Sequence, residues 1–133
     1  MAIQKPFIVE PHSLGTIATG NEKTNRKALN LGRFENQGKV WETTGTANAW
    51  ARGDFGAAKE VDFVGLLSTN ATATTTAQLR LGDTQAEVDG TADYDSAAQL
   101  IRSPAIDHWS GLYHWYWEMP SLQTKRWWRI DIG

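Results

Sequence analysis

Hydrophobic and polar residues alternate with a period of two in several short stretches of the chain. Such stretches, rich in β-branched and aromatic residues and bounded by Gly, Asn, Asp or Pro, predict strands at residues 39–44, 46–55, 60–69, 77–82, 112–119 and 126–132. Residues 1–10 are compatible with a further, first strand. Residues 11–38 show no clean period, which predicts an irregular arm with one helical turn at residues 25–29.

The alternation also assigns faces to the predicted strands. In two of them the side chains expected in the core are Ala77, Leu79, Leu81, Trp128, Ile130 and Ile132. Residues 60–69 are apolar on both sides, which predicts a central strand covered on both faces. One side carries Val61, Phe63 and Leu67, and the other carries Val64 and Leu66.

The aromatic segment at residues 112–119 divides in the same way. One face carries Tyr113, Trp115, Trp117 and Met119, and the other carries Leu112, His114, Tyr116 and Glu118. The first set is continuous and large, so it is expected to pack in the core. The second set mixes aromatic and polar groups, so it is expected to face water or a binding partner.

One short helix is predicted at residues 95–102, which open with Asp-Ser and stop before Ser103 and Pro104. Several short strands with turn signals between them indicate an all-β sandwich or jelly roll. The chain of 133 residues has the size of one domain. We therefore expect an N-terminal strand and irregular arm at residues 1–38 and a sandwich at residues 39–133.

Composition narrows the classes of partner. Thirteen Lys and Arg stand against fifteen Asp and Glu, and the formal charge of −2 gives no bias toward nucleic acid or anionic lipid. No stretch approaches the 18 apolar residues of a membrane span. The chain has no cysteine, which excludes disulfides, thiolate metal sites and a cysteine nucleophile.

Motifs that would indicate an enzyme are missing from the sequence. The histidines His12, His108 and His114 have no metal-ligand spacing, and no GxSxG, P-loop or GxGxxG motif occurs. Glu42, Glu118 and Asp131 are scattered carboxylates that would have to meet in space to act as a glycosidase pair. Residues 82–96 hold five carboxylates without EF-hand spacing, which favours a solvated acidic loop over a Ca²⁺ site. We predict a protein that is not an enzyme and that needs no cofactor or metal.

A binding role for the polar aromatic residues stays open beside a purely structural one. Exposed Trp and Tyr beside polar groups serve carbohydrate stacking and protein interfaces, but they are also common on the solvent side of strands. The candidate ligand-binding residues are Trp109, His114, Tyr116, Trp41 and Asn70.

The order of four motifs carries a family resemblance. KVWETTGTANAW, DFGAAKEVDFVGLLSTN, AQLRLGDT and KRWWRIDIG follow one another between residues 39 and 133. In this order they resemble the discoidin-like (coagulation factor 5/8 type C) branch of the galactose-binding-like jelly rolls. Residues 54–56 take the place of an Asp-Leu-Gly turn, and Trp128, Arg129 and Ile130 match the closing strand. The resemblance implies a galactose-binding-like jelly-roll β-sandwich.

A second resemblance concerns the lead-in ATGNEKTNRKALNL, residues 18–31, together with the following V-W strand. Small domains with these features resemble structural proteins that tailed bacteriophages encode. The resemblance implies a non-enzymatic virion component, associated with the tail or its tip and assembled in the bacterial cytoplasm. Its partners would be other virion proteins in an oligomeric assembly. The alternative is a free-standing carbohydrate-binding module for a cell-surface glycan.

Overall fold

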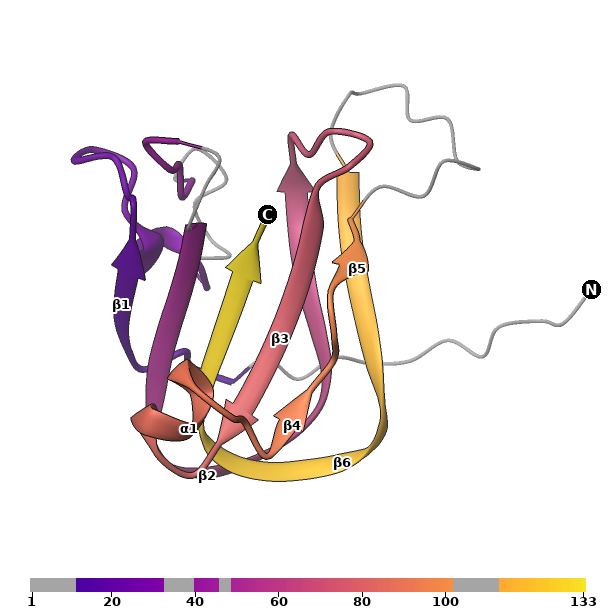
Figure 1. Ribbon diagram of the computed structural model, residues 1–133. Coiled ribbons are helices and arrows are strands. Elements are labelled where there is room, and N and C mark those ends of the chain that lie inside the picture. The colour runs from indigo at the N-terminus through magenta and orange to yellow at the C-terminus, as the bar shows by residue number, and fades with distance from the viewer. Residues whose placement is uncertain (1–11, 33–39, 46–48, 102–112) are drawn as a thin grey trace, which may run out of the picture.

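The computed structural model describes residues 12–32, 40–45, 49–101 and 113–133, most of them in extended strands (Figure 1). The strands are β1 (Thr16–Gly20), β2 (Ala49–Thr69), β3 (Thr76–Gly82), β4 (Tyr94–Asp95), β5 (Gln99–Leu100) and β6 (Tyr113–Ile132). The described helices are a 3-10 turn, η1 (Ala28–Asn30), and one short α-helix, α1 (Gln85–Asp89). The predicted all-β class is confirmed, whereas the strand expected at residues 1–10 lies outside the described residues.

The strands form one antiparallel sheet in the order β1-β2-β6-β3-β4, with β5 also paired to β3. β2 and β6 have 21 and 20 residues, and they bend together so that the sheet folds back on itself (Figure 1). The bend lies at a register shift between Asp54 and Lys59, where Gly56 has a φ of 82°. β2 and β6 each therefore join two strands that the sequence pattern predicted separately.

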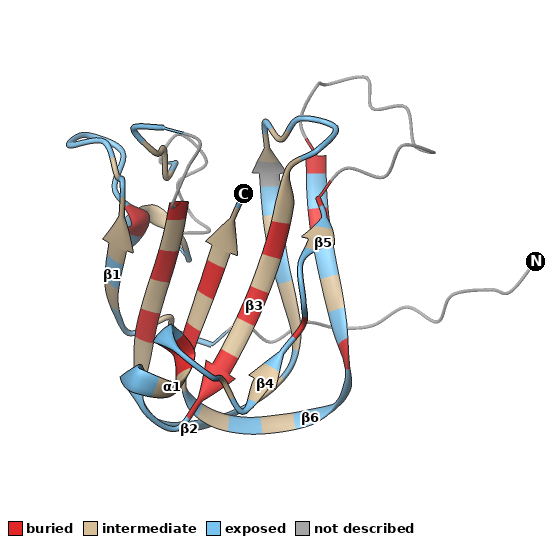
Figure 2. Ribbon diagram, in the orientation of Figure 1, coloured by how far each residue is buried: buried red, intermediate tan, exposed pale blue. Residues whose placement is uncertain are grey.

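The core lies between the two halves of the folded sheet, and Figure 2 marks its buried positions along the strands. Its buried members are Ala28, Ala51, Ala77, Leu79, Leu81, Ile101, Tyr113, Trp115, Met119, Trp128 and Ile130. Trp117 and Ile132 are partly buried against them. The faces predicted for residues 77–82, 113–119 and 126–132 are thus confirmed. The jelly-roll connectivity that the family resemblance implies stays a prediction.

Residues 60–69 differ from the prediction because the pairing of β2 with β6 is irregular there. The register of β2 against β6 shifts between Val61 and Phe63, so the side-chain alternation changes there. Val61 packs against the core together with Val64 and Leu66, not on the side opposite to them. The other side is not covered as predicted, since Leu67 is 55% exposed.

The prediction of a helix at residues 95–102 is wrong. The carboxylate of Asp95 accepts a hydrogen bond from the amide of Ala97 at 2.8 Å, and Ala97 has a φ of 54°. Ser96 is buried and exchanges hydrogen bonds with the backbone of Leu79, which extends the β3 ladder. The Asp-Ser pair therefore forms a turn between β4 and β5. The helix begins earlier, where Thr84 and Glu87 form a capping box before α1.

Two elements lie inside the segment for which the sequence predicted an irregular arm. β1 pairs with the first part of β2, and Thr19 donates its hydroxyl to the carbonyl of Trp50 at 2.8 Å. η1 at Ala28–Asn30 overlaps the predicted helical turn. Of the strand predicted at residues 39–44, residues 40–44 form no regular strand, but they bond through the backbone to residues 21–26 and make an isolated bridge between Thr43 and Glu22. β1 makes residues 16–20 part of the sheet.

Replacing Trp128 by Ala should lower the free energy of unfolding by about 3–5 kcal/mol. The ring is only 6% exposed, and it lies so close to Gly53 that a Cβ there would approach it to 2.4 Å. Its Nε1 donates to the carbonyl of Leu14 at 3.0 Å, which ties residue 14 to the core. Urea unfolding followed by fluorescence measures the loss.

Leu122→Ala is the control for this substitution, because Leu122 is 54% exposed. Its effect should stay within about 0.5 kcal/mol. Similar losses for the two variants would show that Trp128 does not anchor the core.

Candidate functional site

The clearest candidate surface is the outer side of the ribbon formed by residues 63–69 of β2 and 113–118 of β6. His114 and Tyr116 lie here, and their rings stack with centroids 6.2 Å apart. Tyr116 also stacks with Phe63, with ring centroids 5.8 Å apart, and it remains 55% exposed. We call Phe63, Leu67, His114 and Tyr116 the aromatic face.

Glycine makes room for this arrangement. Gly65 lies directly opposite Tyr116 in the β2·β6 ladder, and a Cβ on Gly65 would meet the tyrosine ring at 3.3 Å. The ring therefore lies over the glycine backbone, close to Phe63 on the same strand as Gly65. A glycine inside a strand is a sequence signal for such a close approach, and it could have identified Gly65 beforehand.

Two of the other candidate ligand residues, Trp41 and Asn70, do not belong to this group. Trp41 is partly buried against the core, and its buried indole Nε1 makes no hydrogen bond. It belongs to the segment that pairs with residues 21–26, on the β1 side of the sheet. Asn70 is exposed and follows Thr69, which pairs with Tyr113, so it lies at the end of the ribbon. Trp109 lies outside the described residues.

The outer side of the other half of the sheet carries a row of like charges. Arg52, Arg129 and Arg80 are directly opposite one another across β2, β6 and β3. We call them the arginine row. The guanidinium groups of Arg52 and Arg129 both lie over the ring of Trp50, at 5.3 and 4.8 Å from its centroid. Like charges in this position repel, so the row requires neutralisation.

Aspartates supply the opposite charge between and beside the arginines. Asp89 of α1 forms ion pairs with Arg52 and with Arg129, the latter at 2.8 Å. Asp131 pairs with Arg129 at 2.6 Å and lies 3.9 Å from Arg80. Asp95 lies 3.6 Å from Arg80 on the far side. The result is an alternating network that fastens α1 to the sheet.

The acidic residues 82–96 are thus mostly engaged with protein cations. Lys125 pairs with Asp83 at 2.9 Å and also with Asp93. The carboxylate of Glu87 accepts the amides of Asp83 and Thr84, at 2.6 and 2.8 Å. Among the described residues, no three His, Asp or Glu side chains are grouped as a metal site would need. The segment is largely exposed, as expected of a solvated acidic loop, and most of its carboxylates also form ion pairs.

Scattered carboxylates are not brought together as a glycosidase pair. Glu42 pairs with Lys23 and Arg26, on the segment beside β1. Asp131 belongs to the network of the arginine row, whereas Glu118 lies on the ribbon.

The described helices include none long and apolar enough to cross a membrane.

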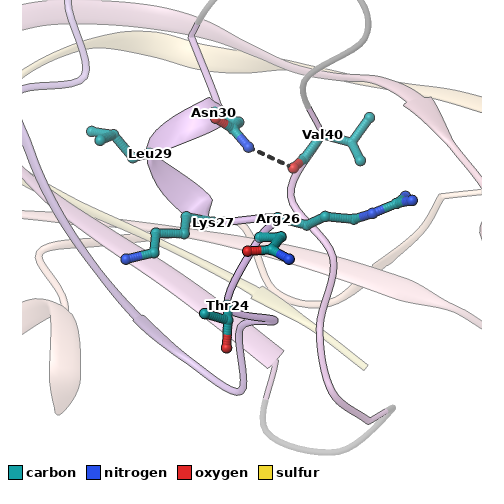
Figure 3. Close-up of a pocket in the computed structure, with 7 residues that line it drawn as sticks. Thr24, Arg26, Lys27, Leu29, Asn30 and Val40 are labelled. Carbon is teal, nitrogen blue, oxygen red and sulfur yellow. Dashed lines mark hydrogen bonds between the residues drawn. The ribbon is translucent and has the colours of Figure 1, made fainter.

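A shallow hollow of about 400 Å³ lies beside η1 (Figure 3). Its lining residues are Thr24, Asn25, Arg26, Lys27, Leu29, Asn30 and Val40. Asn30 donates its side-chain amide to the carbonyl of Val40 at 2.8 Å, which closes one side. Arg26 is held by Glu42 at 3.0 Å. The hollow brings together two basic side chains but no acid and base that could act on a substrate.

A second hollow of about 370 Å³ is lined by residues 12–15, 17, 29, 31 and 32. His12 lies at its edge, where its Nε2 is 2.7 Å from the carbonyl of Glu60 and its ring meets Phe55 edge-on. The histidine therefore fastens the start of the described chain to the bend of β2.

Comparison with known proteins gives no relative. No protein-family model, curated protein or solved structure matches the chain. The aromatic face is therefore the site on which a functional argument has to be built.

Asp89→Asn should lower the free energy of unfolding by about 1–3 kcal/mol, because it leaves Arg52 and Arg129 facing each other without their shared anion. Burial acts to raise the pKa of Asp89, but the hydrogen bonds from Arg52 and Arg129 outweigh it and hold the pKa below its ordinary value. The stabilisation is therefore complete above the unfolded pKa of about 3.9 and is lost as the pH falls through the lower folded pKa. Urea unfolding at several pH values measures it.

Asp83→Asn is the matched control, since Asp83 is 56% exposed and its ion pair with Lys125 lies at the surface. Its cost should stay below about 1 kcal/mol. An Asp89→Asn variant as stable as the wild type at neutral pH would show that the arginine row does not depend on α1.

Proposed function

We propose that the protein is a non-enzymatic structural component of a tailed-bacteriophage virion, associated with the tail or tail tip, which acts as a docking or host-contact module. The observation that carries the binding part of this proposal is the aromatic face. Tyr116 and Leu67 are each 55% exposed there, although the same fold buries Trp115 and Trp128. Neighbouring large apolar side chains left exposed mark interaction surfaces more often than scattered single ones do.

The assignment to a virion rests on the sequence resemblance of residues 18–31 and of the motifs in residues 39–133. The fold is compatible with a docking role, because the sheet holds the aromatic face on two long paired strands. Side chains fixed on strands lose little entropy when a partner binds, which favours a rigid docking surface. The partners in this proposal are other virion proteins.

Mass spectrometry of particles tests the virion assignment. The protein should be present in virions purified from the source culture, together with capsid and tail proteins. A protein that stays in the soluble lysate while capsid and tail proteins pellet would overturn the assignment. That result would leave the binding role of the aromatic face to be tested on the purified protein.

The second candidate function is a carbohydrate-binding module, and the stacked rings of His114, Tyr116 and Phe63 favour it. Sugars bind to aromatic rings beside groups that accept hydrogen bonds. Glu118 offers such a group, since it lies directly opposite Phe63.

A glycan array separates this candidate from the docking module. A lectin should give a signal that Tyr116→Ala abolishes, whereas the substitution should cost only about 1 kcal/mol or less in stability, because the ring is 55% exposed. Asn70→Ala serves as the comparison at the end of the ribbon. Equal glycan signals for the wild type and Tyr116→Ala would exclude the aromatic face as a sugar site.

A further inference from the structure

Three carboxylates on the strands of the ribbon differ from the rest of the acidic residues. Glu60, Asp62 and Glu118 make no ion pair and no side-chain hydrogen bond in the described part of the chain. Every other described Asp or Glu has its carboxylate paired with a cation or accepting a hydrogen bond. Those residues are Glu22, Glu42, Asp54, Asp83, Glu87, Asp89, Asp93, Asp95 and Asp131.

Two of the three unpaired carboxylates lie beside Phe63 of the aromatic face, and the third is close to them in the chain. Glu118 lies directly opposite Phe63 in the ladder, a position in which Cβ atoms are about 5 Å apart. Asp62 directly precedes Phe63 at a register shift, and Glu60 lies two residues before Asp62. All three are exposed, and Lys59 of the same strand makes no ion pair with any of them. Among the described residues, therefore, no cation forms an ion pair with these carboxylates beside the aromatic face.

Exposed aromatic rings and unpaired carboxylates together suit a cationic side chain. A guanidinium or ammonium group gains from the face of a ring and from a charge-assisted hydrogen bond to a carboxylate. The molecule itself contains this combination on its other half, where Arg52 and Arg129 lie over Trp50 and pair with Asp89. There the arginines are internal, whereas around Tyr116 and Glu118 the described residues supply none.

We propose that the aromatic face and its carboxylates bind a protein segment that presents arginine or lysine side chains. One cation lies over the ring of Tyr116 and pairs with Glu118, while Asp62 and Glu60 attract further basic residues. The proposal rests on the proposed docking function and specifies the chemistry of its partner. Nucleic acid does not fit, because its phosphates would be repelled by the same carboxylates.

An NMR titration of the purified, isotopically labelled protein tests this inference. The probe is a short peptide of alternating Arg and Gly residues, and the control peptide has Gln at each Arg position. Amide shifts should change in residues 60–69 and 113–118 with the Arg peptide only. Binding should weaken with added salt, because the three carboxylates are exposed to solvent.

Three variants locate the site. Glu118→Gln and Tyr116→Ala should each weaken peptide binding by roughly two- to fivefold, as exposed ion pairs and cation–π contacts do. The double variant Asp62→Asn/Glu118→Gln should weaken it by about tenfold if the losses add. Asp83→Asn, which removes a carboxylate of equal charge far along the chain, should leave binding unchanged. Urea midpoints equal to the wild type show that the variants are folded.

Two results would overturn the inference. The first is equal affinity of Glu118→Gln and wild-type protein for the Arg peptide, which would place any binding elsewhere. The second is that the Gln peptide binds as tightly as the Arg peptide and that a neutral oligosaccharide shifts the same amide signals. That result would assign the aromatic face to sugar binding. Both results are independent of the virion assignment. The presence of the protein in particles is measured without the peptide, and the basic partner could also be a protein outside the virion.

Discussion

The pairing of β2 with β6 on both sides of the bend is the constraint on which the rest of the structure depends. The two strands pair from Ala49 with Ile132 to Thr69 with Tyr113, with register shifts around the bend of the sheet. Because both strands bend together, the half that carries Trp128 and the half that carries Trp115 come to face each other. The core is the space between them, so the sheet covers its own apolar side without a second sheet or a long helix.

The same register accounts for the charges on the outer side. Ala51, Ile130 and Leu79 form one buried row across β2, β6 and β3. Side chains alternate along a strand, so the next positions, Arg52, Arg129 and Arg80, must form an outward row of like charges. The register cannot slip to separate the arginines, since a shift by one residue would expose the core row. Neutralisation therefore has to come from Asp131 and from neighbouring elements, and α1 supplies Asp89.

Sequence reasoning succeeds where the alternation is regular. The buried positions of β3, and Trp115, Trp128 and Ile130 in β6, follow from period two alone, as does the exposure of His114 and Tyr116. It fails where a backbone irregularity or a local hydrogen bond decides. The register shift between Val61 and Phe63 places the two side chains on different faces, and no residue pattern in the segment fixes the position of such a shift.

The misplaced helix has the same kind of cause. Asp95 and Ser96 have the side chains of a helix start, but the buried Ser96 bonds to Leu79, a partner that is distant in sequence. The helix that does form, α1, follows a capping box at Thr84 and Glu87, and this pattern is recognisable in the sequence. Of the candidate site, His114 and Tyr116 could be named from sequence, whereas Phe63 required the ladder and Trp41 proved to pack against the core.

The two outer faces of the sheet both carry aromatic and charged side chains, but they differ in whether the charges are paired within the molecule. On one face the charges of Arg52, Arg129 and Arg80 are balanced within the molecule, and Trp50 is covered by two of the guanidinium groups. On the other face the carboxylates of Asp62 and Glu118 have no such balance in the described chain, and Tyr116 stays open to solvent. Most described carboxylates pair with a cation or accept a hydrogen bond, whereas those of Asp62 and Glu118 lie on the strands that carry the exposed rings and do neither. The unpaired carboxylates and the exposed rings therefore favour the ribbon as the functional surface. The paired charges of the arginine row favour a structural role for that row.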